Sequence, residues 1–141
     1  MDPSPDRAVL IVDDEEPILF ALRTYLGDAG YAVTCARSLA EALALADRKS
    51  FGVVIADLRL HEPGGTEGLD LIDHLRRRDA RTRVILLTAY GTDEVREAAR
   101  ARGVDVFLHK PQPLAELEAV VRRLLGRPGP PRNDDTGEIE V

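Results

Sequence analysis

Short apolar runs alternate along the chain with longer stretches in which apolar residues recur every three or four positions. The short runs, rich in Val, Ile and Leu, are typical of strands that are buried on both faces. They cover residues 8–12, 31–36, 51–56, 83–87 and 104–109. The stretches with helical spacing cover residues 16–26, 38–48, 68–79, 92–102 and 113–126. The pattern therefore predicts five strands that alternate with five helices.

Residues at the expected helix starts support these boundaries. Ser38 stands where a side chain can cap the second helix, and Glu41 follows three residues later, as in a capping box. Thr92 precedes the acidic Asp93, which suits the positive end of the fourth helix. Pro17 suits a first-turn position, because its missing N–H has no partner to lose there. The starts of three helices are thus encoded locally.

The alternation of strands and helices predicts the fold class and the domain boundaries. Right-handed crossovers between such units give an α/β protein with a five-stranded parallel sheet flanked by five helices. We expect the doubly wound strand order 2-1-3-4-5. The domain should cover residues 7–126, after a disordered N-terminus at 1–6. Residues 127–141 are rich in Pro and Gly and then acidic, so we expect a disordered acidic tail, with a docked segment as the alternative.

Chemically reactive residues follow four of the five predicted strands. Asp13 and Asp14 follow the first strand and Asp57 follows the third, while Thr88 and Lys110 follow the fourth and fifth. In the order 2-1-3-4-5 these four strands are consecutive neighbours, so their carboxyl ends should cluster at one edge of the sheet. The set suits a divalent cation held by carboxylates, a phosphoryl group on Asp57, and a hydroxyl and an ammonium group that receive its oxygens.

Composition narrows the choice of partners. The 141 residues carry a formal net charge of −6, which disfavours nonspecific binding to nucleic acid and favours a protein partner. A single cysteine, Cys35, excludes a disulfide framework and is expected to be a small buried thiol. The apolar runs are too short to span a membrane and no signal peptide is evident, so we expect a cytoplasmic protein that binds neither membranes nor nucleic acid.

The pairs Asp13-Asp14, Thr88-Ala89 and Lys110-Pro111, together with Asp57, resemble the receiver domain of two-component response regulators. The resemblance covers residues 7–126 and implies the flavodoxin-like receiver fold. It also implies that Asp57 accepts a phosphoryl group from a histidine kinase or a histidine phosphotransfer protein. Such a domain signals to a downstream protein target by changing conformation. It is a phosphoacceptor rather than an enzyme, with only self-catalysed phosphotransfer and autodephosphorylation.

The same resemblance assigns roles to the other residues of the set. The cofactor would be Mg²⁺, bound directly by Asp57 and Asp14, mainly through water by Asp13, and by the backbone carbonyl of Arg59. Thr88 and Lys110 would contact the phosphoryl oxygens, and Thr88 would act in the switch together with an aromatic residue, Phe107. The Lys110-Pro111 bond is expected to be cis, as is typical of receivers.

Structural explanations exist for each residue taken alone. Asp13 and Asp14 could serve only as partners of a helix dipole, Thr88 could cap the chain, and Lys110 could be a solvated charge. Their combination with Asp57 favours the functional explanation. The segment after Asp57 is longer and richer in glycine than the receiver pattern, which could alter metal geometry, phosphate lifetime or partner choice.

Two other functions remain open. A Mg²⁺-dependent aspartyl phosphohydrolase would usually carry a second Asp two residues after the nucleophile, where this chain has Arg59. A pseudo-receiver would keep the fold as a binding module without phosphorylation, although here every chemical position is filled. Uptake of phosphate from a small donor discriminates among the three.

Overall fold

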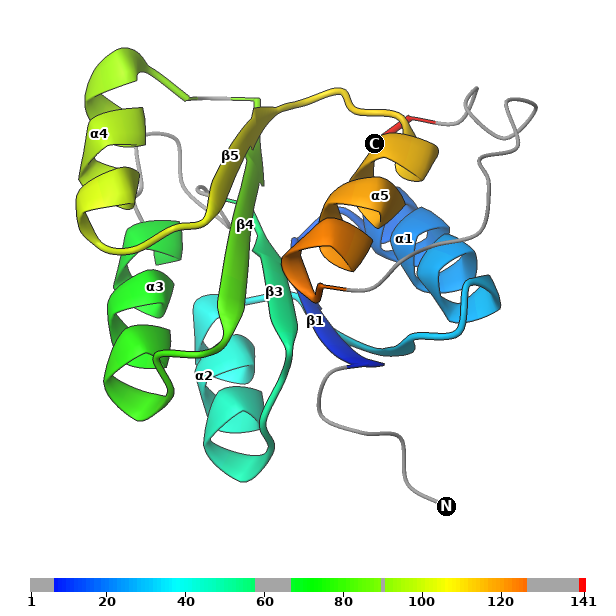
Figure 1. The fold of residues 1–141 in the computed structure, drawn as a ribbon, viewed down its shortest axis with the longest axis horizontal. Coiled ribbons are helices and arrows are strands. Elements are labelled where there is room, and N and C mark those ends of the chain that lie inside the picture. The colour runs from blue at the N-terminus through cyan, green and yellow to red at the C-terminus, as the bar shows by residue number, and fades with distance from the viewer. Residues whose placement is uncertain (1–6, 58–66, 90, 127–139) are drawn as a thin grey trace.

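A five-stranded parallel sheet forms the centre of the computed structural model, which describes residues 7–57, 67–89, 91–126 and 140–141 (Figure 1). The strands lie in the order β2-β1-β3-β4-β5. Their bounds are β1 Ala8–Val12, β2 Ala32–Ala36, β3 Val53–Ala56, β4 Arg83–Thr88 and β5 Val106–His109. The predicted fold class and strand order are therefore confirmed.

Five helices connect and flank the strands. Their bounds are α1 Glu16–Asp28, α2 Leu39–Arg48, α3 Glu67–Arg78, α4 Asp93–Ala101 and α5 Leu114–Leu124. The predicted side-chain cap of α2 is present, because Ser38 Oγ accepts a hydrogen bond from the Glu41 N–H. Thr92, predicted as the start of the fourth helix, also caps it, because its Oγ1 accepts a hydrogen bond from the Val95 N–H. None of the helices in the described part of the chain is long and apolar enough to cross a membrane.

The helices divide between the two faces of the sheet, so the core has two halves (Figure 1). Leu10 and Val12 of β1 point toward α2, α3 and α4, while Val9 and Ile11 point toward α1 and α5. This alternation follows from the two-residue period of a strand. All five residues of β1 are buried, as expected for a central parallel strand.

The second helix packs against the sheet through its small residues. Its leucines at positions 39, 43 and 45 are only partly buried, whereas Ala42 and Ala46 are fully buried against the core. Small side chains let the helix approach the sheet closely. Cys35, expected to be a buried thiol, is only partly buried, and this burial raises the pKa of its thiol.

The fifth strand begins two residues later than predicted because its first residues serve other contacts. The Val104 N–H closes the end of α4 on the Ala99 carbonyl. The Asp105 carboxylate accepts hydrogen bonds from the Val84 N–H at 2.8 Å and from Arg76 at 3.0 Å. Arg76 also donates to the carbonyls of Gly103, Ala80 and Thr82, so one guanidinium joins α3 to the start of β4 and the start of β5.

Two residues of the predicted tail lie against the domain. The Gln112 N–H donates to the Val141 carbonyl at 2.6 Å, the Val141 N–H donates to the Gln112 carbonyl at 2.8 Å, and Glu140 pairs with Pro113 in an antiparallel bridge. The Val141 side chain is buried with the core residues of α1 and α5. For Glu140 and Val141 the structure thus differs from the expected disorder, because an apolar side chain finds a site beside α5. Residues 1–6 and 127–139 lie outside the described residues.

Candidate functional site

Three of the predicted site residues lie at the carboxyl edge of the sheet, each one position beyond a strand. The Asp13 N–H donates to the Ala36 carbonyl, and the Asp57 N–H donates to the Val12 carbonyl, both at 3.0 Å. The Lys110 N–H donates to the Thr88 carbonyl in the same way, also at 3.0 Å. The hydrogen bonds of the sheet therefore continue past the strands and fix the backbone of all three residues.

The ammonium group of Lys110 joins the two carboxylates. Its Nζ donates to Asp13 Oδ2 at 2.8 Å and to Asp57 Oδ2 at 2.9 Å. The side chains are well shielded, with exposed fractions of 12% for Lys110, 4% for Asp13 and 8% for Asp57. The bond from Lys110 to Pro111 is cis, as the resemblance implied.

A second donor, which the sequence analysis did not identify, orients Asp13. The Glu15 N–H donates to Asp13 Oδ1 at 2.9 Å, at the start of α1. One oxygen of Asp13 thus faces a backbone amide and the other faces Lys110. The short polar turn between β1 and α1 is the only local signal for this contact.

Burial and ion pairing act against each other in this cluster. Burial raises the pKa of Asp13, and the hydrogen bonds from Lys110 and from the Glu15 N–H offset the effect only in part. Burial also disfavours the ammonium form of Lys110, but the hydrogen bonds to Asp13 and Asp57 together outweigh it, so the pKa of Lys110 is raised. The amine therefore stays charged at neutral pH and provides the counter-charge for two acids.

The remaining predicted residues have different environments. Thr88 is fully buried at the end of β4, next to β3 and β5, and so lies at the same edge as Asp57 and Lys110. Phe107 is partly buried on β5 and packs against the core beneath α4. Asp14 is exposed. Arg59, whose carbonyl was predicted to bind metal, lies outside the described residues, as does the rest of the glycine-rich segment 58–66.

The carboxylates that could bind a metal ion lie near one another in this structure, but they are not arranged around a single point. Within the described ranges, no group of three His, Cys, Asp or Glu side chains is arranged to hold a metal ion. Asp13 and Asp57 converge on Lys110, and Asp14 lies next to Asp13 at the surface. Carboxylate oxygens are the ligands that Mg²⁺ prefers, so these residue types fit a hard divalent cation.

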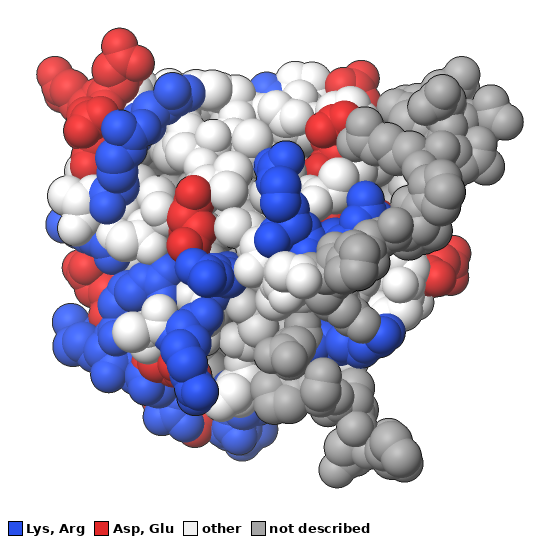
Figure 2. Space-filling model, viewed as in Figure 1, with Lys and Arg blue, Asp and Glu red and all other residues white. Residues whose placement is uncertain are grey.

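The opposite edge of the sheet, where the strands begin, is rich in positively charged side chains. Figure 2 shows Lys and Arg side chains gathered over the lower part of the face that α3 and α4 cover. Arginines lie at the ends of α3 and α4, in the turn before β4 and at its start, namely Arg76, Arg77, Arg78, Arg81, Arg83, Arg100 and Arg102. Cations at helix C-termini are favoured by the helix dipole.

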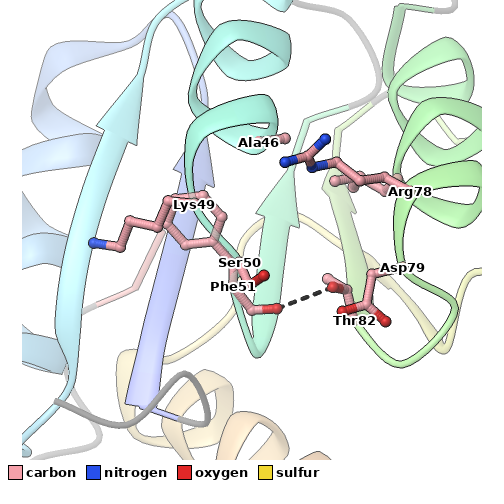
Figure 3. A pocket seen from close by; sticks show the side chains of 8 residues that line it. Ala46, Lys49, Ser50, Phe51, Arg78, Asp79 and Thr82 are labelled. Carbon is pink, nitrogen blue, oxygen red and sulfur yellow. Dashed lines mark hydrogen bonds between the residues drawn. The ribbon is translucent and has the colours of Figure 1, made fainter.

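A hollow of about 190 Å³ also lies at this opposite edge, between the ends of α2 and α3 (Figure 3). Phe51, Leu75 and Ala46 form its apolar part, and the Thr82 hydroxyl donates to the Phe51 carbonyl at 3.0 Å across it. Because the acidic cluster lies beyond the other ends of the strands, the hollow is separate from the candidate site.

Comparison with known proteins agrees with this fold. The family model for the response regulator receiver domain matches residues 9–122. The chain belongs to this family. Receiver domains of response regulators are phosphorylated on an aspartate, bind a divalent metal for phosphorylation and partner with histidine kinases. They are generally signalling phosphoacceptors rather than enzymes.

A curated relative is the photosynthetic apparatus regulatory protein RegA of Cereibacter sphaeroides, 35% identical over 132 residues, which are 91% of this chain and 68% of RegA. The chain spans 66% of the acid tolerance regulatory protein ActR of Sinorhizobium medicae, at 37% identity, and less than half of several other relatives.

A solved structure is also similar. The receiver domain protein of Methanospirillum hungatei JF-1 superposes with a TM-score of 0.79 at 25% identity, covering 85% of this chain and 94% of that one.

Proposed function

We propose that Asp57 accepts a phosphoryl group from a histidine kinase or a histidine phosphotransfer protein and that the chain signals to a downstream protein by changing conformation. The observation that carries this proposal is the position of Lys110, whose ammonium lies 2.9 Å from one oxygen of the Asp57 carboxylate. A buried carboxylate with a charged amine beside it has both a nucleophilic oxygen and a group that can neutralise incoming phosphoryl oxygens.

The chemistry of this step follows from the side chains. An oxygen of Asp57 attacks the phosphorus in line with the leaving group, so a P–O bond forms while the P–N bond of a phosphohistidine, or the P–O bond of an acyl phosphate, breaks. Lys110 then turns its ammonium from the carboxylate oxygens toward the oxygens of the transferred group, and the Thr88 hydroxyl donates to another of them. Water reverses the modification by hydrolysing the acyl phosphate.

A divalent cation such as Mg²⁺, when bound, supplies further positive charge toward the transferring group. Asp57 and Asp14 would hold it directly, Asp13 mainly through water, and the Arg59 carbonyl would be a further ligand. The exposure of Asp14 supports this division, because an exposed carboxylate can turn toward a cation at the mouth of the site, whereas Asp13 is held on both oxygens. Lys110 offsets the repulsion between the two buried acids by donating to both of them.

The signal would pass from Asp57 through Thr88 and Phe107. Thr88 is buried between β3 and β5, so a shift of its hydroxyl toward the phosphoryl group leaves space beside it. Phe107 lies on the adjacent strand and is only partly buried, so its ring is able to move into that space. Since phenylalanine has no phenolic hydroxyl, packing alone determines which ring position is stable.

Intact-mass measurement after incubation with acetyl phosphate and Mg²⁺ tests the proposal. We expect one phosphoryl group on the wild type and none on Asp57→Asn, because an amide is a poor nucleophile. Asp73→Asn is a matched control, since Asp73 lies on α3, away from the strand ends, and pairs with Arg102 at the surface. A full adduct on Asp57→Asn would refute the assignment of the acceptor.

The same experiment separates the two alternatives. Steady release of inorganic phosphate, many equivalents per protein, would indicate an aspartyl phosphohydrolase. Absence of any adduct on a folded wild type would indicate a pseudo-receiver that works by binding alone. The ion bridge between Lys110 and Asp57 favours the phosphoacceptor over the pseudo-receiver, because a binding module has no need of a charged amine beside its buried acid.

A further inference from the structure

Three residues surround the aromatic ring of Phe107. The guanidinium carbon of Arg96, on α4, lies 5.3 Å from the ring centroid, in the range of a cation–π contact. The ring of His109 meets it edge to face, with centroids 5.4 Å apart and planes at 73°. Gly91, in the connection between β4 and α4, lies beneath the tip of the ring. The ring therefore has neighbours from α4, from β5 and from the preceding loop.

Gly91 leaves the ring just enough room. A Cβ atom at position 91 would lie 2.4 Å from Phe107 Cζ and 2.7 Å from Cε1, closer than Cβ atoms come to other atoms in real structures, and 3.2 Å from His109 Cε1, a tight but tolerable distance. The backbone of Gly91 is not in the left-handed region, so its conformation does not demand glycine. The atoms in conflict are the far end of a rotatable side chain. An alanine at this position would therefore displace the ring rather than the backbone.

Arg96 links the same ring to the site. Its Nη2 lies 3.1 Å from His109 Nε2, which therefore accepts a hydrogen bond from the guanidinium. His109 directly precedes Lys110, whose ammonium bridges Asp13 and Asp57. A continuous set of contacts thus runs from α4 through Arg96 and His109 to the residue that holds the acceptor.

We propose that Gly91 and Arg96 are positioning residues for the Phe107 ring. They stabilise the ring position that the protein adopts when Asp57 carries no phosphoryl group. The Asp57 carboxylate here accepts directly from Lys110, so the described ring position accompanies the unmodified acceptor. Any change that disfavours this ring position shifts the protein toward the alternative position. By linkage it also tightens the binding of a phosphoryl group or its mimic, by at most the factor by which the equilibrium shifts. This inference rests on the proposed function.

Fluorine NMR of protein labelled with 4-fluorophenylalanine reports the ring directly, since the chain has only three phenylalanines. We expect Gly91→Ala to move the Phe107 resonance, without any ligand, toward its position in the beryllofluoride-bound wild type. The dissociation constant for beryllofluoride, measured with Mg²⁺ present, should fall at least threefold. Arg96→Met should lower it about twofold to fivefold, as expected from the loss of one cation–π contact.

Two controls separate positioning from a general effect on the fold. Gly27→Ala lies on α1, where a Cβ would meet nothing within 4 Å, and it should change neither the resonance nor the affinity. In a Phe107→Ala background, Gly91→Ala should have no effect on beryllofluoride affinity, because the ring that it displaces is gone.

The outcomes distinguish this inference from the proposed function. A wild type that takes up neither phosphate nor beryllofluoride would overturn the proposed function and the coupling with it. Normal beryllofluoride binding with equal affinities in the wild type and Gly91→Ala would overturn the inference alone. An affinity change that persists in the Phe107→Ala background would also overturn it, because the effect would then not pass through the ring.

Discussion

Replacing Lys110 by methionine is expected to destabilise the native state by about 2–4 kcal/mol in metal-free buffer. The Lys110 side chain is 12% exposed and its ammonium donates to two shielded carboxylates, so removing it leaves two neighbouring acids without their cation. Removing one partner of a buried ion pair typically costs about 3–5 kcal/mol. We expect somewhat less here, because the cluster lies at the edge of the sheet and Asp13 keeps the Glu15 N–H.

Urea denaturation in EDTA measures this loss, and the chain offers a matched control. Lys49 is the only other lysine, and its exposed ammonium lies over the ring of Phe51, so Lys49→Met should cost no more than about 1 kcal/mol. Adding Asp13→Asn to Lys110→Met should recover most of the lost stability, because one of the two unpaired charges is then gone. Mg²⁺ should stabilise the single variant more than the wild type. Binding to the folded state stabilises both, but in the variant no ammonium competes with the cation for the carboxylate oxygens.

A Lys110→Met variant within about 0.5 kcal/mol of the wild type, the range of ordinary surface substitutions, would refute the reasoning. It would mean that protonation or water compensates for the lost ammonium. Equal stability of the single and double variants would also contradict it, since repulsion between Asp13 and Asp57 would then not be the cause.

Other regions of the domain offer further tests. Arg76→Met should lose about 1–2 kcal/mol in urea denaturation, since the Asp105 carboxylate and the carbonyls of Thr82 and Gly103 lose a charged donor that is only 20% exposed. Exposed Arg77→Met should stay within about 0.5 kcal/mol. Deleting Glu140 and Val141 should lower the free energy of unfolding by about 1 kcal/mol. This is the gain from burying a valine side chain minus the entropic cost of ordering the segment. An unchanged free energy would show that the pairing of Val141 with Gln112 is not maintained in solution. Thr88→Ala should still accept phosphate but should weaken the beryllofluoride-dependent change in hydrogen exchange over residues 92–124; a full wild-type change would exclude Thr88 as the coupling residue.

The sequence predicted the features that depend on neighbouring residues. Ser38 caps α2 as expected, and α4 begins after Thr92 as expected, because a capping hydrogen bond reaches only three residues along the chain. Each site residue could be assigned to a strand end because the carboxyl ends of parallel strands all lie at a single edge of the sheet. The convergence of Asp57 and Lys110 needed only the strand order in addition.

Features that depend on contacts between distant segments could not be predicted. Three consecutive arginines occupy positions 76–78, and the sequence does not distinguish them. Among them, Arg76 is the one that joins α3 to the starts of β4 and β5. Successive helical residues point about 100° apart, so which arginine turns inward depends on the rotation of the helix against the sheet. Val141 comes after a Pro/Gly-rich segment, and nothing local shows that its side chain has a site beside α5. Gly91 likewise has no marked role until the ring of Phe107 is placed above it.

The bridge made by Lys110 spans most of the chain. Its two hydrogen bonds join residues that are 97 and 53 positions apart in the sequence. During synthesis Asp13 and Asp57 emerge long before their amine, so a nascent or truncated chain that lacks β5 has the acceptor without its counter-ion. Contacts of such high sequence separation form late in folding. Under the proposed function, competence to accept a phosphoryl group would therefore arise only when the last strand has joined the sheet, and phosphorylation would report that this strand is in place.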